Sequence, residues 1–346
     1  MIKSIKIHGL NGQERYLEYH FNEDLNILTG QNGCGKTTLL KILWYINSGM
    51  ISRLDDEIRF DIIEVEIGNH LIIIKKSNEE VCSISIDGKI RFDRESDREK
   101  MSRIGIRSRY YLDRCFYTIN KEIWASIFFP TFRRIEGGFF MDDDISDAFR
   151  NYSDQMSNER HKFIASVSTK DIDDYLRIQY SSISKESLEV QQNTFNQIKE
   201  LIKDNTDGER DIQTHIGNLI KKSETQVKTL KKPFDILKKA MLSILHHKGI
   251  QVDNFLFGEE EGSISSNKLS AGEKQMLSFL CYNAFARNTI IFIDEPELSL
   301  HPDWQRKLMP RLLDQGTGNQ YIIATHSPFI YTQYPDKEIE MDQKGE

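Results

Sequence analysis

The sequence predicts an α/β protein with an antiparallel β region near its N-terminus and an inserted helical hairpin. A glycine-rich loop, Gly30–Thr37, stands between a short apolar run and a helical stretch. Further along, two buried-strand runs at 290–293 and 321–324 lead directly into polar residues. Between these parts, apolar residues at helical spacing dominate from Ile183 to Leu245. The combination predicts a parallel sheet flanked by helices.

Changes in periodicity set the expected domain boundaries. We expect one discontinuous α/β unit at 1–180 and 249–346, interrupted by a helical insertion at 181–248. In the N-terminal part, alternating apolar runs are separated by Gly68-Asn69 and Asp87-Gly88, which predicts antiparallel hairpins.

The insertion is expected to be an αα-hairpin. Asn205-Thr206-Asp207-Gly208 is a turn sequence between two apolar stripes, and Pro233 is expected to start or kink a third helix. We expect arms of about 20–25 residues, or roughly 30–40 Å at 1.5 Å per residue. Such arms are too short for the long coiled coil of a chromosome-tethering machine.

Composition excludes several classes of protein. The chain has 346 residues, 38% of them hydrophobic, so a sizeable core is available. A net charge of −7 argues against a polycation that coats nucleic acid or membranes. No apolar run approaches the ~20 residues of a transmembrane helix, and the first residues lack the apolar core of a signal peptide. We therefore expect a soluble cytoplasmic protein with no membrane partner.

The segment Gly30–Thr37 carries the first chemical signal. Its sequence, Gly-Gln-Asn-Gly-Cys-Gly-Lys-Thr, matches the phosphate-binding pattern G-x-x-x-x-G-K-[ST] between a strand and a helix. Loop amides and the helix N-terminus favour a phosphate. Lys36 is expected to reach the β- and γ-phosphates, and Thr37 to offer a hydroxyl to Mg²⁺. The pattern predicts a nucleoside triphosphate site.

Two adjacent carboxylates follow the buried run 290–293. As the last residue of a strand in a parallel sheet, Asp294 would lie at the carboxyl edge, where it could coordinate Mg²⁺. Glu295 could orient or deprotonate an attacking water. The simpler interpretation is a solvated turn, which the apolar strand beside it disfavours.

Two further segments have both a structural and a chemical interpretation. Ser270 and Glu273 form a capping-box pattern, and Gly272 would let the backbone approach an anion at the same helix N-terminus. A second phosphate cradle suggests a composite site shared between two subunits. His326 follows the run 321–324 and could contact a γ-phosphate, or it could be a satisfied core histidine.

Together these motifs resemble those of ABC-class ATPases. The resemblance rests on four segments in the typical order: Gly30–Thr37, Leu269–Gln275, Asp294–Pro302 and Thr325–Ser327. They are similar to the Walker A, signature, Walker B with D-loop, and switch-histidine motifs. The forms LSAGEKQ and DEPELSLHP resemble the branch of SMC and overcoming-lysogenization-defect proteins. The motifs flank the chain, and residues 45–260 are covered only loosely.

The resemblance implies ATP and Mg²⁺ as cofactors and an ABC/SMC-type P-loop ATPase head as the fold. Glu295 would be the catalytic base and His326 the γ-phosphate sensor. Ser270 and Gly272 would close on the ATP of the opposite protomer, which implies a homodimer with composite ATP sites. The expected metal ligands are Thr37 and Asp294. The expected nucleotide contacts are Asn32, Gly33, Cys34, Gly35, Lys36, Thr37, Thr38, Ser270 and Gly272.

The chain also resembles the bacterial anti-phage ATPases of the Septu and retron-associated kind. This resemblance rests on the aromatic segment Phe128–Glu136, the short helical insertion and Ser327–Ile330. It implies an ATPase that works with an effector, commonly a nuclease of HNH or Toprim type. Only 20 residues follow His326 (346 − 326), too few for the Toprim nuclease of overcoming-lysogenization-defect proteins. We therefore expect a separate effector protein.

Some features depart from these families or have two interpretations. Two acidic clusters could form a two-metal nuclease site, although acidic loops are usually solvated; they are Asp142-Asp143-Asp144 and Asp171, Asp173 and Asp174. For the glutamine that links nucleotide to insertion in the family, Gln179 is a weak candidate. Arg133 and Arg134 could sense phosphate or a partner, or they could pair with Glu136.

Lysines concentrate in the second half of the insertion. From Lys221 to Lys248 there are eight lysines against Glu224 and Asp235, a local net charge of +6 (8 − 2). Four of them fall near one helix face: Lys221, Lys228, Lys232 and Lys239. This Lys221–Lys239 face could bind nucleic-acid phosphates. A solvated helix face is the simpler interpretation.

The sequence as a whole favours an ATP-driven dimerising switch in phage defence that restrains or triggers a separate effector, a nuclease. One rival is a DNA-repair or chromosome-type ATPase that acts directly on DNA. A second rival, a transporter subunit, fits the LSAGEKQ form and the large insertion least well.

Overall fold

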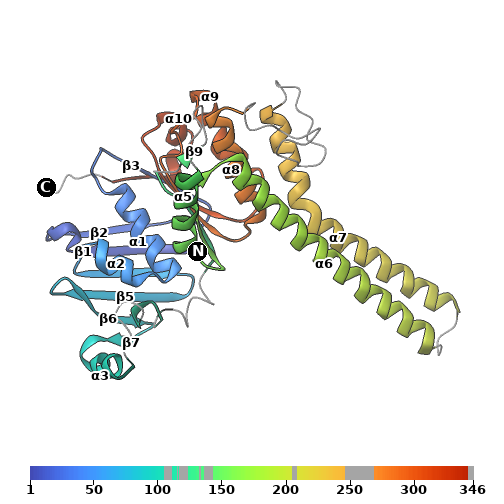
Figure 1. The fold of residues 1–346 in the computed structure, drawn as a ribbon, viewed down its shortest axis with the longest axis horizontal. Helices are drawn as coiled ribbons and strands as arrows, with labels where there is room; N and C mark the ends of the chain where they lie inside the picture. Colours follow the sequence, from blue (N-terminus) through green and yellow to red (C-terminus); the bar gives the residue numbers. More distant parts are fainter. Residues whose placement is uncertain are drawn as a thin grey trace.

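The computed structural model describes residues 1–104, 111–114, 116, 124–131, 134–135, 143–204, 209–245 and 269–341. Two six-stranded sheets form the body of the molecule, and a long helical hairpin extends from one side (Figure 1). The predicted combination of an antiparallel region, a parallel sheet and an inserted helical hairpin is confirmed.

The first sheet, sheet A, is antiparallel and has the strand order β2-β1-β4-β5-β6-β7. Its strands are β1 Ile2–His8, β2 Tyr16–His20, β4 Ile62–Ile67, β5 His70–Ser77, β6 Glu80–Ile86 and β7 Lys89–Asp93. The predicted turns at Gly68-Asn69 and Asp87-Gly88 connect β4 to β5 and β6 to β7.

The second sheet, sheet B, is parallel and has the order β10-β8-β12-β13-β3-β14. Its strands are β3 Leu25–Thr29, β8 Ser126–Phe129, β10 His161–Phe163, β12 Ile290–Asp294, β13 Gln320–Ala324 and β14 Glu338–Glu340. Within the aromatic segment Phe128–Glu136, strand β8 ends at Phe129. The short strands β9 Arg134–Ile135 and β11 Ser166–Val167 pair separately.

Successive side chains along the strands of sheet B point to opposite faces, and each face packs into its own hydrophobic core. In β12, Ile290 and Phe292 join a cluster with α1 and sheet A, whereas Ile291 and Ile293 join a cluster with α8 and α9. Because both faces are covered, every residue of β12 is buried.

The helices are α1 Lys36–Ser48, α2 Ile51–Glu57, α3 Arg94–Ile104, α5 Asp143–Gln155, α6 Thr169–Asp204, α7 Glu209–Leu245, α8 Ala271–Phe285, α9 Pro302–Leu313 and α10 Pro328–Tyr331.

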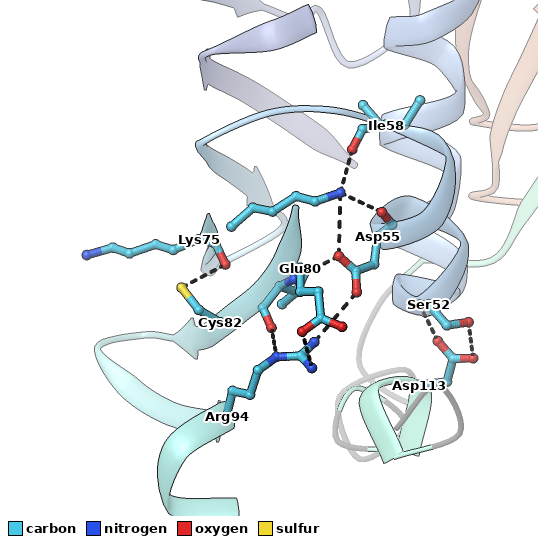
Figure 2. A network of polar contacts seen from close by, with 10 residues as sticks. Ser52, Asp55, Ile58, Lys75, Glu80, Cys82, Arg94 and Asp113 are labelled. Carbon is cyan, nitrogen blue, oxygen red and sulfur yellow. Dashed lines mark hydrogen bonds and ion pairs between the residues drawn. The ribbon is translucent and has the colours of Figure 1, made fainter. Parts of the chain in front are cut away.

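A polar network fastens α2 to the far strands of sheet A (Figure 2). The Lys76 ammonium, only 6% exposed, donates to the Ile58 carbonyl at 3.0 Å and pairs with Asp55 at 3.5 Å. Arg94 lies 3.7 Å from the same aspartate and 2.9 Å from Glu80. Burial raises the pKa of Asp55, and the hydrogen bond from the Val81 amide and the two cations oppose only part of that rise. The network thus joins α2 to β5, β6 and the start of α3.

The hairpin arms are longer than expected. Helix α6 has 36 residues and α7 has 37, or about 54 Å each at 1.5 Å per residue. Asp171 accepts hydrogen bonds from the backbone amide and hydroxyl of Ser168, so α6 begins well before residue 181. Helix α7 continues through Pro233, so the prediction that a third helix starts at this residue is wrong. The turn predicted at 205–208 lies outside the described residues.

None of the helices in the described ranges combines the length and the apolar character that crossing a membrane requires.

Candidate functional site

The glycine-rich loop lies between β3 and α1, as the sequence predicts. Gly35 is the N-cap of α1 and has φ 99°, a left-handed conformation that favours glycine. Asn32, Gly33 and Thr37 are exposed, and Cys34 and Thr38 are partly exposed. The first amides of α1 have no carbonyl partner within the helix, and they lie at the carboxyl edge of sheet B, where an anion is favoured.

Lys36 is the cation of this loop. Its side chain folds back over the loop, so that Nζ donates to the carbonyl oxygens of Gly30 at 2.9 Å and Gln31 at 3.1 Å. The residue is only 6% exposed. Phosphate oxygens carry charge and are stronger acceptors than carbonyls, so the ammonium is placed to bind a phosphate entering the loop.

Asp294 ends β12 beside this loop and is 1% exposed. Thr37 donates its hydroxyl to one carboxylate oxygen at 3.1 Å, and Thr131 donates to the other. Hydroxyl and carboxylate oxygens are the ligands that Mg²⁺ prefers, and Mg²⁺ usually completes its shell with water and phosphate. This donor set therefore fits the predicted metal site at Thr37 and Asp294.

Thr131 is a residue of the site that the sequence analysis missed. It follows β8 by two positions, and β8 pairs with β12 so that Phe129 lies opposite Ile293. The signal was available, because the aromatic run before Pro130 is a buried strand whose end must lie at the same edge as Asp294. Gln179, proposed as the glutamine that links nucleotide and insertion, lies on α6 in the hairpin instead.

Glu295 takes a conformation that is unusual for a non-glycine residue, with φ 48°. Its amide donates to the Ala324 carbonyl at 2.8 Å, which anchors the turn after β12. Burial raises the pKa of Glu295, the neighbouring carboxylates of Asp294 and Glu297 raise it further, and His326 and Lys36 oppose the rise. A half-buried carboxylate with a raised pKa is suited to accept a proton.

Glu297 connects the turn after β12 to the segment after β13. Its carboxylate accepts the Thr325 hydroxyl at 2.7 Å and the His326 amide at 2.7 Å. The His326 side chain is exposed, so the alternative of a satisfied core histidine is wrong. Sequence analysis gave Glu297 no role, although it was visible as a third carboxylate close to Asp294.

The predicted capping box at α8 is confirmed. Ser270 accepts the Glu273 amide at 3.3 Å, and the Glu273 carboxylate accepts the Ser270 amide at 2.7 Å. Helix α8 also abuts the turn after β12, because a Cβ on Gly272 would lie 2.5 Å from the Ser299 carbonyl oxygen. The Gln275 amide donates to the Pro296 carbonyl at 2.9 Å. Ser270 itself is exposed.

The acidic cluster on α6 has a structural explanation. Asp171 accepts the Ser168 amide at the start of α6 and pairs with Arg150 at 2.8 Å, and Asp173 pairs with Arg177 at 2.6 Å. Groups of three or more histidine, cysteine or acidic residues that could hold a metal are absent from the described part of the chain. The side chains of Asp142-Asp143-Asp144 and of Arg133, Arg134 and Glu136 lie outside the described residues.

The comparison with protein families identifies the family of the chain. A family model of the AAA ATPase domain matches residues 1–331. The chain belongs to this AAA ATPase family. Membership of an ATPase family is consistent with the glycine-rich loop and the carboxylates at this edge of sheet B.

Individual relatives place this ATPase more closely. The retron Ec83 probable ATPase of Escherichia coli is 31% identical over 97 residues, covering 24% of this chain and 18% of the relative. Septu protein PtuA of Bacillus thuringiensis is 39% identical over 62 residues, 18% of this chain and 15% of the relative. The predicted resemblance to retron-associated and Septu ATPases is confirmed.

A third relative aligns along most of this chain. Endonuclease GajA of Bacillus cereus (strain VD045) is 25% identical over 324 residues, which is 88% of this chain and 52% of that protein. The chain thus spans at most about half the length of these curated relatives.

Proposed function

We propose that this ATPase is an Mg²⁺- and ATP-dependent dimerising switch that controls a separate effector, a nuclease, in anti-phage defence. The observation that carries the proposal is the gathering of Lys36, Asp294 and Glu295 at one edge of sheet B, with His326 hydrogen-bonded beside them. The relatives named for retron and Septu systems, and the endonuclease GajA, support the defence context.

The proposed reaction assigns each group one task. Lys36 and the loop amides bind the β- and γ-phosphates, and Thr37 and Asp294 hold Mg²⁺, which would neutralise charge on the transferring phosphoryl group. Glu295 accepts a proton from the attacking water at its carboxylate. Glu297 holds the His326 amide, which keeps the imidazole next to the phosphate position.

The proposed dimer uses the exposed N-terminus of α8. A capped helix N-terminus with a glycine in its first turn is suited to an anion, and Ser270 is exposed to a second molecule. We propose that Ser270 and Gly272 of one protomer close on the ATP held by Lys36 of the other. Hydrolysis would then separate the two heads and change the state of the effector.

The test compares two site variants with a matched surface variant. Glu295→Gln should bind ATP, hydrolyse it at least 100-fold more slowly and accumulate as a dimer, because only the base is lost. Lys36→Ala should lose binding and the ATP-dependent dimer. Glu189→Gln removes an exposed carboxylate on α6 and should behave as wild type.

ATP turnover, equilibrium binding and light scattering after size exclusion would measure these three effects. A Glu295→Gln protein that hydrolyses ATP at the wild-type rate would show that Glu295 is not the catalytic base. If the Glu295→Gln protein stays monomeric when loaded with ATP, the proposed ATP-dependent dimer is contradicted. Affinity purification of the Glu295→Gln variant with MgATP would then identify the effector. If no nuclease copurifies, the proposal of a nuclease effector is contradicted.

A second candidate function is direct action on DNA. Lys221, Lys228, Lys232 and Lys239 are all exposed along α7, and within the described ranges none of the four has an ion-pair partner. Free lysines in a row can bind backbone phosphates. This candidate predicts ATPase activity that rises with duplex DNA and loses that response when the four lysines become glutamate; ATPase activity indifferent to DNA argues against it.

A further inference from the structure

Two short segments carry the proposed proton acceptor and the proposed phosphate-contacting histidine. Glu295 begins the turn after β12, which runs to Leu300, and His326 follows β13. The Glu297 carboxylate joins the two segments from within the turn. Helix α9 provides a second connection, through the side chain of Gln305, which has no task in the proposed reaction.

The partly buried Gln305 side chain contacts both segments. Its amide nitrogen donates to the carbonyl oxygen of Leu300 at 2.7 Å and, at the longer distance of 3.4 Å, to that of Glu297. Its amide oxygen accepts the Ser327 hydroxyl at 2.5 Å. A primary amide has two donor hydrogens and an acceptor oxygen, and this one uses all of them. One side chain thus connects the end of the turn to the residue after His326.

Helix α9 holds Gln305 in place. The inner face of the helix is buried in the core that it shares with α8, through Leu308, Met309 and Leu312. On the neighbouring turn, the Arg306 guanidinium lies 4.3 Å from the ring centre of Phe329 in α10. These contacts do not depend on the Gln305 amide, so a substitution there should loosen the two segments without unpacking the helix.

The turn after β12 needs such support because two of its residues have a left-handed backbone. The φ angles are 48° at Glu295 and 67° at Ser299, and neither residue is glycine. Such conformations cost free energy and persist where surrounding contacts fix them. Gln275 on α8 donates to the Pro296 carbonyl at 2.9 Å, and Gln305 holds the other end of the turn from α9.

The two segments also interact electrostatically. Burial raises the pKa of Glu295, the carboxylates of Asp294 and Glu297 raise it further, and His326 and Lys36 oppose the rise. A displacement of the segment after β13 would therefore change the proton affinity of Glu295 as well as the position of the imidazole.

We propose that Gln305 is a positioning residue for ATP hydrolysis: its amide holds the turn that carries Glu295 and the segment that carries His326 in one arrangement. The inference rests on the proposed function, in which these two residues act on the attacking water and the γ-phosphate. Gln305 should affect turnover rather than ATP binding, because binding depends on Lys36 and the loop amides.

Steady-state ATP turnover by the full chain tests this inference. Gln305→Met has a similar length and no N–H donor, so kcat should fall about tenfold while KM for ATP changes less than about twofold. Ser327→Ala removes the hydrogen bond to one segment and should lower kcat about threefold. The matched control is Gln333→Met, because exposed Gln333 donates to the Phe329 carbonyl within its own segment, and kcat should stay at the wild-type value.

The double variant Gln305→Met/Ser327→Ala separates positioning from a general loss of stability. If both substitutions act through one hydrogen bond, the double variant should have the kcat of Gln305→Met alone, whereas independent effects would multiply. Urea unfolding would establish that each variant is folded under the assay conditions. If Gln305→Met does not fold, Ser327→Ala decides alone: a lower kcat at constant KM supports the inference, and a wild-type kcat overturns it.

The contradicting outcomes separate this inference from the proposed function. A wild-type kcat in Gln305→Met, a higher KM at constant kcat, or multiplied effects in the double variant would overturn the positioning role alone, provided that the wild type hydrolyses ATP. A wild type without ATP turnover would overturn the proposed function and this inference together.

Discussion

The carboxyl edge of sheet B and the α6–α7 hairpin differ in how far their side chains are buried and hydrogen-bonded. At the edge, Asp294 is 1% exposed and each of its carboxylate oxygens accepts a threonine hydroxyl. On the hairpin, Leu188, Phe195 and Ile202 lie seven residues apart on α6 and are 57%, 66% and 56% exposed. The hairpin projects from the body, so the rest of the chain covers little of the hairpin surface (Figure 1).

This difference indicates that amino-acid substitutions are tolerated better on the hairpin than at the edge of sheet B. Groups at the edge are tied to one another across four segments of the chain, so one substitution disturbs several hydrogen bonds. Along the outer hairpin, each helix contacts mainly its neighbour, and exposed positions are free to vary. Chemistry is therefore constrained at the edge, and recognition of other molecules has room to differ on the hairpin.

The largest expected effect is at Asp294. Asp294→Asn should lower ATP turnover at least 100-fold, because a neutral amide is a poor ligand for Mg²⁺. Turnover measured across a range of Mg²⁺ concentrations would show the loss. The hairpin variant Glu189→Gln should retain wild-type turnover; equal losses in both variants would contradict the contrast between the two regions.

Gly272→Ala tests how closely helix α8 abuts the turn after β12. A Cβ would lie 2.5 Å from the Ser299 carbonyl oxygen, so the backbone must shift, at a cost of about 1–3 kcal/mol of unfolding free energy. Urea unfolding followed by circular dichroism would measure it. An unchanged unfolding midpoint would mean that the helix moves without strain.

Glu297→Gln should act on turnover more than on binding. The glutamine keeps one acceptor and turns an amide donor toward either the Thr325 hydroxyl or the His326 amide. We expect kcat to fall about tenfold with KM for ATP changed less than twofold, since one hydrogen bond to a charged group is lost. Steady-state kinetics would separate the two constants, and a higher KM at constant kcat would contradict a positioning role.

His161 makes stability depend on pH. Burial lowers its pKa to about 3 from the ordinary 6.5, and Arg160 adds a smaller effect. As pH falls below about 6.5, the unfolded chain gains a proton that the folded chain excludes, so unfolding free energy decreases, by at most about 1.4 kcal/mol per pH unit. The loss continues toward pH 3.

Urea unfolding at several pH values would measure this slope. His161→Gln should have a shallower slope than wild type between pH 6.5 and 4. His215→Gln on the exposed part of α7 is the control and should keep the wild-type slope. Identical slopes in all three proteins would show that His161 does not cause the dependence.

The smallest effect is expected on the hairpin. Gly217 lies exposed within α7, and a Cβ there would meet no atom within 4 Å. Gly217→Ala should therefore raise unfolding free energy by about 0.5–1 kcal/mol, through lower backbone entropy of the unfolded chain. The same glycine-to-alanine substitution should therefore raise the unfolding free energy at Gly217 and lower it at Gly272, provided that the hairpin and the body unfold together.

Local patterns were enough to locate the core of the site. A strand, a glycine-rich loop and a helix follow one another directly around Lys36, so the loop geometry depends on neighbours in sequence. The same is true of Asp294 and Glu295 after a fully apolar strand. The capping box at Ser270 was equally visible, because its hydrogen bonds join residues three apart.

Some predictions failed for lack of long-range information. The apolar stripe on α6 includes Leu188, Phe195 and Ile202, whose side chains face solvent, whereas Ile198 and Leu201 of the same stripe are partly buried. Helical periodicity identifies an apolar face, but it does not say which residues of that face find a partner. Arm length was underestimated because Ser168-x-x-Asp171, a helix-start signal, was overlooked.

The sequence by itself determined the class of machine, because loop amides, lysine and paired carboxylates act through spacing along the chain. Only the tertiary structure decided that Thr131 donates to Asp294 and that Glu297 holds His326, since these contacts join segments brought together by parallel strand pairing. Pairing and packing depend on the whole chain at once, whereas a motif depends on a few neighbours.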